Sequence, residues 1–140
     1  MKKLFFFGFV IVSFWSCSVD PVNEDFYFEI LPIESVSIPN EMRFSEVYTI
    51  GYSYFKPSSC HFFNDLYYVA EINVRTIAVI NKVLNSNENT ICETLTNELE
   101  ERSFNFHVNK NEGAYIFKFW QGEDENGHDT YLVFEVTIVQ

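Results

Sequence analysis

Residues 115–138 read YIFKFWQGEDENGHDTYLVFEVTI, two alternating runs on either side of an acidic turn. Apolar side chains fall on every second position, which is the period of a β-strand with one face in a core. These side chains are Tyr115, Phe117 and Phe119 in the first run, and Leu132, Phe134, Val136 and Ile138 in the second. Asn126-Gly127 between them is typical of a tight hairpin turn, because both residues tolerate positive φ. The stretch therefore predicts an antiparallel β-hairpin.

The same period of two recurs through the rest of the chain. Its apolar positions are Tyr48, Ile50, Tyr52 and Tyr54, then Ile77, Val79 and Val83, then Phe104, Phe106 and Val108. Pro32 and Pro39 bracket residues 33–38, which predicts an edge strand because proline cannot donate to a ladder. About seven or eight short strands without a long helix predict an all-β fold, an antiparallel β-sandwich over residues 26–140. The pattern resembles immunoglobulin-like sandwiches, which implies that Tyr115 to Phe119 form the penultimate strand.

Two segments break the simple alternation. Asn64-Asp65 predicts a turn between extended runs over residues 60–63 and 66–71. Residues 90–93 (TICE) have the form of a helix capping box, and Ile91, Leu95 and Leu99 follow at helical spacing. A short helix therefore stays an alternative for residues 90–102. We expect instead a loop that leads into a strand from about Glu98, with a β-bulge near Glu101.

The first sixteen residues have the layout of a secretory signal peptide. Lys2 and Lys3 form a basic head, and residues 4–15 are almost all apolar. A helix of that length spans about 18 Å, whereas a bilayer core of about 30 Å needs around 20 residues. Residues 1–16 are therefore expected to be a cleaved leader.

Phe14-Trp15-Ser16-Cys17 resembles the lipobox of bacterial lipoproteins, of the loose form seen in Bacteroidota. The resemblance implies that Cys17 becomes the mature N-terminus, with a diacylglyceryl thioether and an acylated amine as its membrane anchor. Residues 17–25 would then be a lipidated tether, and the protein an outer-membrane lipoprotein facing the periplasm or the cell surface. Phe14 and Trp15 depart from the usual leucine and small residue. An ordinary cleaved signal and an uncleaved anchor are the alternatives.

Charge and cysteine content narrow the class of protein. Seven Lys and Arg stand against twenty Asp and Glu beyond residue 16, a formal charge of −13. Such a field repels nucleic acid and favours cationic partners. Cys60 and Cys92 are the remaining cysteine pair, and a disulfide is expected between them in an oxidising compartment.

The acidic loop holds the candidate binding residues. Asp124, Asn126 and Asp129 offer hard oxygens for a calcium ion, although their spacing is not that of an EF-hand. Trp120, at the end of its strand, is a candidate aromatic anchor for a sugar or a protein. No nucleophile motif or metal-ligand spacing is present. Paired carboxylates such as Glu100-Glu101 would point to opposite faces of a strand, so neither catalysis nor a cofactor is predicted.

These observations favour a lipid-anchored envelope protein that acts as a non-enzymatic structural or interaction module with an envelope protein partner. One alternative is an inhibitor that captures a basic secreted hydrolase such as a lysozyme, because an acidic surface steers cationic partners. Another is calcium or carbohydrate binding through residues 120–129.

Overall fold

The computed structural model describes residues 25–140, and these form nine β-strands and no helix. The strands are β1 (Phe26–Leu31), β2 (Ser35–Ser37), β3 (Glu41–Arg43), β4 (Val47–Phe55), β5 (His61–Glu71), β6 (Val74–Leu84), β7 (Leu99–His107), β8 (Ala114–Glu123) and β9 (Asp129–Val139). Sheet A contains β1, β3, β5, β6, β8 and β9, and sheet B contains β2, β4 and β7. The all-β class is confirmed, with nine strands where seven or eight were expected.

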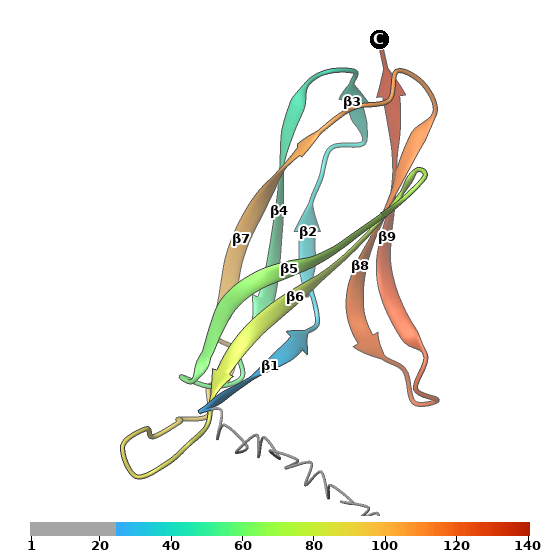
Figure 1. Ribbon diagram of the computed structural model, residues 1–140. Coiled ribbons are helices and arrows are strands. Elements are labelled where there is room, and N and C mark those ends of the chain that lie inside the picture. Colours follow the sequence, from blue (N-terminus) through green and yellow to red (C-terminus); the bar gives the residue numbers. More distant parts are fainter. Residues whose placement is uncertain (1–24) are drawn as a thin grey trace, which may run out of the picture.

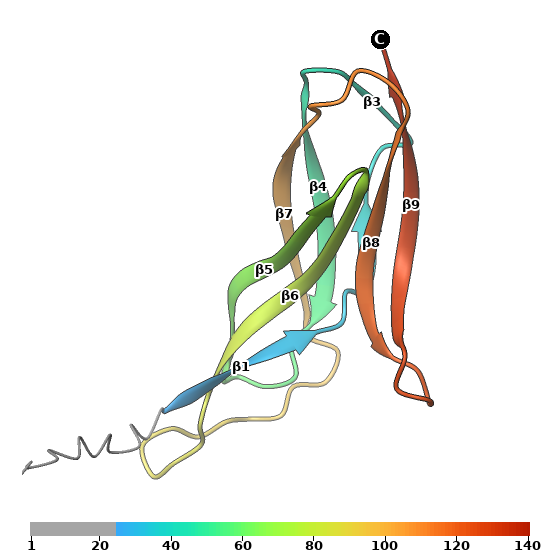
Figure 2. The same cartoon turned by 45° about the vertical axis from the view of Figure 1, so that its right-hand side comes forward.

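The two sheets pack as layers around one aromatic core (Figures 1 and 2). The predicted inward positions lie in this core: Tyr115, Phe117 and Phe119 have no exposed surface, and Phe106 packs edge-on against the first two rings at 4.9 and 5.0 Å. Ile50, Tyr52 and Tyr54 cover them from sheet B. Alternation therefore located the core correctly on both sheets.

β6 organises sheet A because it pairs with three strands. β5 covers one of its edges, from His61 opposite Val83 to Glu71 opposite Val74. The other edge is shared: β1 pairs with the second half of β6, and β8 pairs with the first half. Toward its tip, the β8–β9 hairpin turns away from β6 (Figures 1 and 2).

The expectation of a purely antiparallel sandwich is wrong at two pairs, since β6–β8 and β3–β9 are parallel. In both cases the chain has visited sheet B and then returns to sheet A, through β7 before β8 and through β2 before β3. A strand that re-enters a sheet from the other layer need not reverse its direction, as a hairpin strand must.

Two local expectations are also corrected. Asn64-Asp65 does not form a turn: β5 runs through it with a register shift between Phe63 and Asp65, because β6 pairs with both halves. β7 begins at Leu99 and pairs with β4 without a register break, so there is no bulge near Glu101. Residues 90–98 form a loop rather than a helix, as preferred from the sequence.

The expected leader (residues 1–16), Cys17 and the tether up to residue 24 lie outside the described residues.

Candidate functional site

The face of sheet A that points away from the core carries large apolar side chains. Here this surface is called the outer face of sheet A. Its exposed members are Phe28, Ile30, Phe62, Tyr67 and Val133, each between 46% and 58% exposed. Successive side chains of a strand point to opposite faces of the sheet. These residues therefore point away from the core, while residues such as Leu31 and Val79 point into it. Exposed apolar surface that extends over several strands is typical of sites that contact a protein, a ligand or a membrane.

Three lysines lie against aromatic rings of this face. The Lys82 ammonium lies 3.9 Å from the Phe26 ring centroid, and that of Lys56 lies 5.2 Å from Phe62. Lys118 lies 4.2 Å from the ring of Tyr131. A cation over a ring face is stabilised by the negative quadrupole of the ring. The aromatic rings of this face therefore already accept cations.

A cleft of about 490 Å³ opens on the outer face where the β8–β9 hairpin leaves β6. We call it the aromatic cleft. It is lined by Ile30, Tyr67, Thr76, Ala78, Trp120, Glu123, Asp129 and Tyr131, which come from five strands. The Ile33 backbone N–H donates to the Trp120 carbonyl at 2.8 Å, which ties β8 to the chain just beyond β1. The volume is in the range of small-ligand sites.

Asp129 accepts hydrogen bonds from two aromatic side chains of the cleft. Its Oδ1 accepts the Trp120 indole N–H at 2.8 Å, and its Oδ2 accepts the Tyr131 hydroxyl at 3.4 Å. Glu123 is its direct partner in the β8–β9 register. Burial raises the pKa of Tyr131, and the Asp129 charge raises it further. The hydroxyl of Tyr131 therefore stays protonated and holds the carboxylate in place.

Asp124 and Asn126 shape the hairpin loop instead of lining the cleft. Asp124 Oδ1 accepts the backbone N–H groups of Asn126 at 2.8 Å and His128 at 2.9 Å. Both hydrogen bonds lower the pKa of Asp124, and the one from His128 has the larger effect. Of the Asn126-Gly127 pair, only Gly127 takes positive φ, at 78°.

Of the four candidate binding residues, the structure thus brings together Trp120 and Asp129. Asp124 already uses one carboxylate oxygen within its own turn. Among residues 25–140, no group of three or more His, Cys, Asp and Glu side chains is arranged to hold a metal ion.

The expected disulfide is confirmed. Cys60 and Cys92 are bonded, with their Cα atoms 5.3 Å apart, and both lie outside the strands. The bond joins the turn before β5 to the loop between β6 and β7, which carries the chain from sheet A to sheet B.

Beside the disulfide lies a hydrogen-bonded chain that the sequence did not reveal. Ser58 Oγ lies 2.7 Å from His61 Nδ1, and His61 Nε2 lies 2.7 Å from Glu29 Oε2. The order resembles a nucleophile, base and acid. The Ser58 to His61 spacing was visible in the sequence, but Glu29 joins them only because β1 and β5 flank the same end of β6.

The surroundings of Ser58 favour a structural role for this chain. Ser58 Oγ accepts the Cys60 backbone N–H at 3.2 Å. The N–H of Ser59 donates to the Glu93 carbonyl and that of His61 to the Ser58 carbonyl. Acyl transfer needs free N–H groups to stabilise an oxyanion, and the donors of this turn are engaged. The network instead fastens the disulfide turn to β1.

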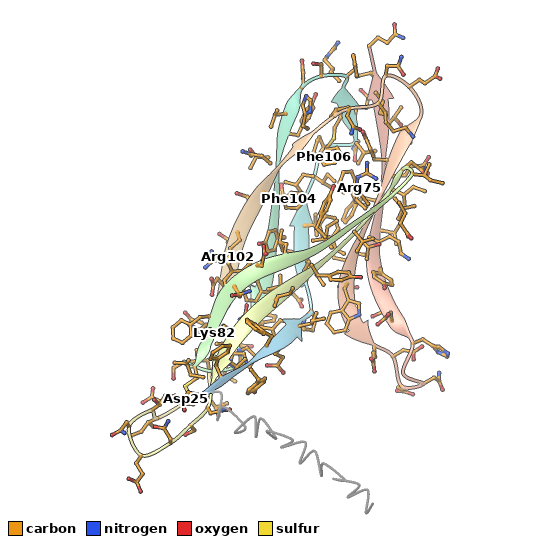
Figure 3. All side chains as sticks on the ribbon, viewed as in Figure 1. Asp25, Arg75, Lys82, Arg102, Phe104 and Phe106 are labelled. Atoms are coloured by element: carbon orange, nitrogen blue, oxygen red, sulfur yellow. A yellow bond between two sulfur atoms is a disulfide. The ribbon has the colours of Figure 1, made fainter. Side chains whose placement is uncertain are left out.

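A second concave region lies between the facing edges of β5 and β7, with a volume of about 550 Å³. Figure 3 shows Arg75 beside Phe104 and Phe106 at this place. Arg75 is 7% exposed, and its guanidinium lies 4.9 Å from the Tyr115 ring centroid and 5.9 Å from that of Phe106. It also donates to the carbonyls of Ile72 and Val74. These contacts partly offset the burial of the cation and tie it to the β5–β6 turn.

Comparison of the chain with protein-family models, with curated proteins and with solved structures returned no match in any of the three. Within residues 25–140 there is no helix with the length and hydropathy needed to cross a bilayer.

Proposed function

We propose that this protein is a lipid-anchored, non-enzymatic interaction module of the bacterial cell envelope, in which residues 26–140 form an immunoglobulin-like β-sandwich. The observation that carries the interaction role is the apolar outer face of sheet A, which carries exposed aromatic side chains and the aromatic cleft. Burying Phe28 or Tyr67 against a partner would remove apolar surface from water at about 25 cal/mol per Å².

The anchor rests on the lipobox resemblance at Cys17. A fully extended tether of residues 17–25 reaches about 30 Å at roughly 3.3 Å per residue. β1 is the first strand after the tether, and it supplies Phe28 and Ile30 to the outer face of sheet A. An anchor at Cys17 would therefore hold this face close to the envelope surface. Mass spectrometry of the native product tests the anchor: an acylated Cys17 supports it, and a free thiol or an intact leader contradicts it.

Capture of envelope proteins by the full chain tests the interaction role. Phe28→Ser together with Tyr67→Ser should abolish capture of the partner, because both side chains are exposed and apolar. The matched control is Thr49→Ala together with Asn105→Ala, which changes a hydrogen-bonded pair on the opposite side of the molecule. Capture that survives the first double variant, or is lost equally in the control, would count against this function.

A second candidate, supported by the charge of the cleft, is capture of a basic secreted hydrolase. Glu123 and Asp129 line the cleft, and within residues 25–140 neither forms an ion pair. The formal charge of −13 beyond residue 16 would accelerate encounter with a cationic enzyme. Loss of lysozyme activity at micromolar protein supports this candidate, and full activity disposes of it.

A further inference from the structure

We propose that the aromatic cleft binds the guanidinium group of an arginine side chain on a basic protein partner, an inference that rests on the interaction role proposed above. The cleft combines three aromatic rings, from Tyr67, Trp120 and Tyr131, with the carboxylates of Glu123 and Asp129. Guanidinium groups stack on aromatic planes and bind carboxylates in a bidentate manner.

The hydrogen-bonding groups that line the cleft favour a ligand rich in donors. In the described chain its lining includes no Lys, Arg, His, Asn or Gln side chain. Tyr131, one of the three hydroxyl groups of the lining, already donates to Asp129. The Trp120 indole N–H is likewise engaged with Asp129, and the hydroxyls of Tyr67 and Thr76 can accept as well as donate. What the lining offers is therefore mainly acceptors and ring faces. Guanidinium has five N–H donors and no acceptor, whereas a sugar hydroxyl both donates and accepts.

Asp129 keeps room for such a ligand. An ionised carboxylate accepts at about four lone-pair positions, and the Trp120 and Tyr131 bonds occupy two of them. Those two bonds also fix the orientation of the carboxylate before a ligand arrives. A preorganised acceptor loses less freedom on binding than a mobile one.

Lys118 shows that the rings of this site accept a cation. Its ammonium lies 4.2 Å from the Tyr131 ring centroid, from the neighbouring position on the outer face of β8. Lys118 does not line the cleft, but its positive charge beside the Tyr131 ring opposes an incoming cation. Guanidinium is less strongly hydrated than ammonium and is planar, so an arginine can displace the flexible Lys118 stem.

The test is a titration of the full chain with Nα-acetyl-arginine amide, followed by the indole N–H resonance of Trp120. That signal is distinguished from the signal of Trp15 by its loss in Trp120→Phe. The neutral isostere Nα-acetyl-citrulline amide is the matched ligand, since it replaces one guanidinium nitrogen by an oxygen. We expect the arginine probe to shift the Trp120 resonance saturably, with a Kd at least tenfold lower than that of the citrulline probe.

Matched variants locate the binding to the cleft. Asp129→Asn and Glu123→Gln should each raise the Kd for the arginine probe about tenfold. Glu125→Gln removes the same charge from the same loop outside the cleft lining and should leave the Kd within twofold. Lys118→Gln should lower the Kd, because it removes the opposing positive charge. Thermal melts of all four variants verify that they are folded.

Several results would overturn the inference. Two of them concern the probes: the citrulline or lysine probe binds as tightly as the arginine probe, or N-acetylglucosamine or calcium gives a response and arginine gives none. The third is that Glu125→Gln weakens binding as much as the cleft variants do.

The result of the arginine titration can be separated from the test of the interaction role. Partner capture that depends on Phe28 and Tyr67 while arginine fails to bind would reject the arginine site alone, and loss of capture would reject the interaction role whatever the probe does.

Discussion

The outward faces of the two sheets are built by the same alternation and carry different chemistry. On sheet B, the outward side chains of β4 and β7 are mostly small or polar, and Thr49 donates to Asn105 across the strands at 2.9 Å. Its exposed apolar residues, Val47, Phe55 and Leu99, lie only at the strand ends. On sheet A, the corresponding face carries the exposed aromatic residues and the aromatic cleft.

Sheet B shows what a solvated outer face of this sandwich looks like. Antiparallel sheets with one face in water normally show polar outward positions, and sheet B follows this rule. Sheet A departs from it over several strands, although both sheets cover the same core. This difference between the two outer faces is the observation on which the proposed interaction role rests.

The largest effect on stability should come from truncating a core side chain on the inner face of sheet A. Phe117 is fully buried between Phe106 and Phe119, so Phe117→Ala should lower the free energy of unfolding by about 3–5 kcal/mol. Phe28→Ser, on the outer face of the same sheet, should change it by about 0.5 kcal/mol or less. Urea denaturation measures both. Comparable losses would mean that the outer face stabilises the fold and would break the comparison.

Removing the disulfide should have the next largest effect. Cys60–Cys92 restrains the loop through which the chain passes from sheet A to sheet B. The chain-entropy model gives about 3.7 kcal/mol for a loop of this length, equivalent to a fall in Tm of roughly 15 °C. Cys60→Ala with Cys92→Ala should reproduce the effect of reduction and leave the arginine titration unchanged. Identical melting of oxidised and reduced protein would contradict the expectation.

Alkaline pH should lower the free energy of unfolding, because two tyrosines lie on the inner face of sheet B. Burial raises the pKa of Tyr52 and of Tyr54 to about 12, although the nearby Arg102 opposes the shift. Since the folded-state pKa exceeds the unfolded value of about 10, the stabilisation is complete below pH 10 and is lost as the pH rises toward 12. Urea midpoints across this range measure the loss. Tyr52→Phe with Tyr54→Phe is the control and should flatten the profile; an equally steep profile would argue against these tyrosines as its cause.

The inner faces could be predicted from the sequence because their information is local. Alternation fixes which side chains share a face, so the burial of Ile77, Val79 and Phe117 followed directly. The β8–β9 hairpin was predictable for the same reason, since Asn126-Gly127 stands between its strands. The disulfide followed from cysteine number and expected compartment.

The aromatic cleft was not predictable because it depends on strand pairing between distant segments. Its residues come from β1, β5, β6, β8 and β9, and they meet only because β1 and β8 share one edge of β6. Trp120 and Asp129 were identified because they belong to one hairpin. Tyr67 was missed, since an exposed tyrosine in an alternating run resembles a core residue until the register is known.

The smallest effect should come from two glycines that belong to the two compared regions. Gly127, at φ 78°, closes the loop that carries Asp129, and Gly127→Ala should destabilise the fold by about 1 kcal/mol because a Cβ disfavours this conformation. Gly51 lies on the outer face of sheet B, where an added Cβ would meet Ser37 Cβ at an ordinary 3.5 Å. Gly51→Ala should therefore change the free energy of unfolding by about 0.5 kcal/mol or less.

The two glycine variants should also differ in binding. Because only Gly127→Ala strains the hairpin beside the aromatic cleft, only this variant should weaken binding of the arginine probe. Equal losses of binding in both variants would show that the probe senses global stability, and the contrast between the two outer faces would then lose its functional meaning.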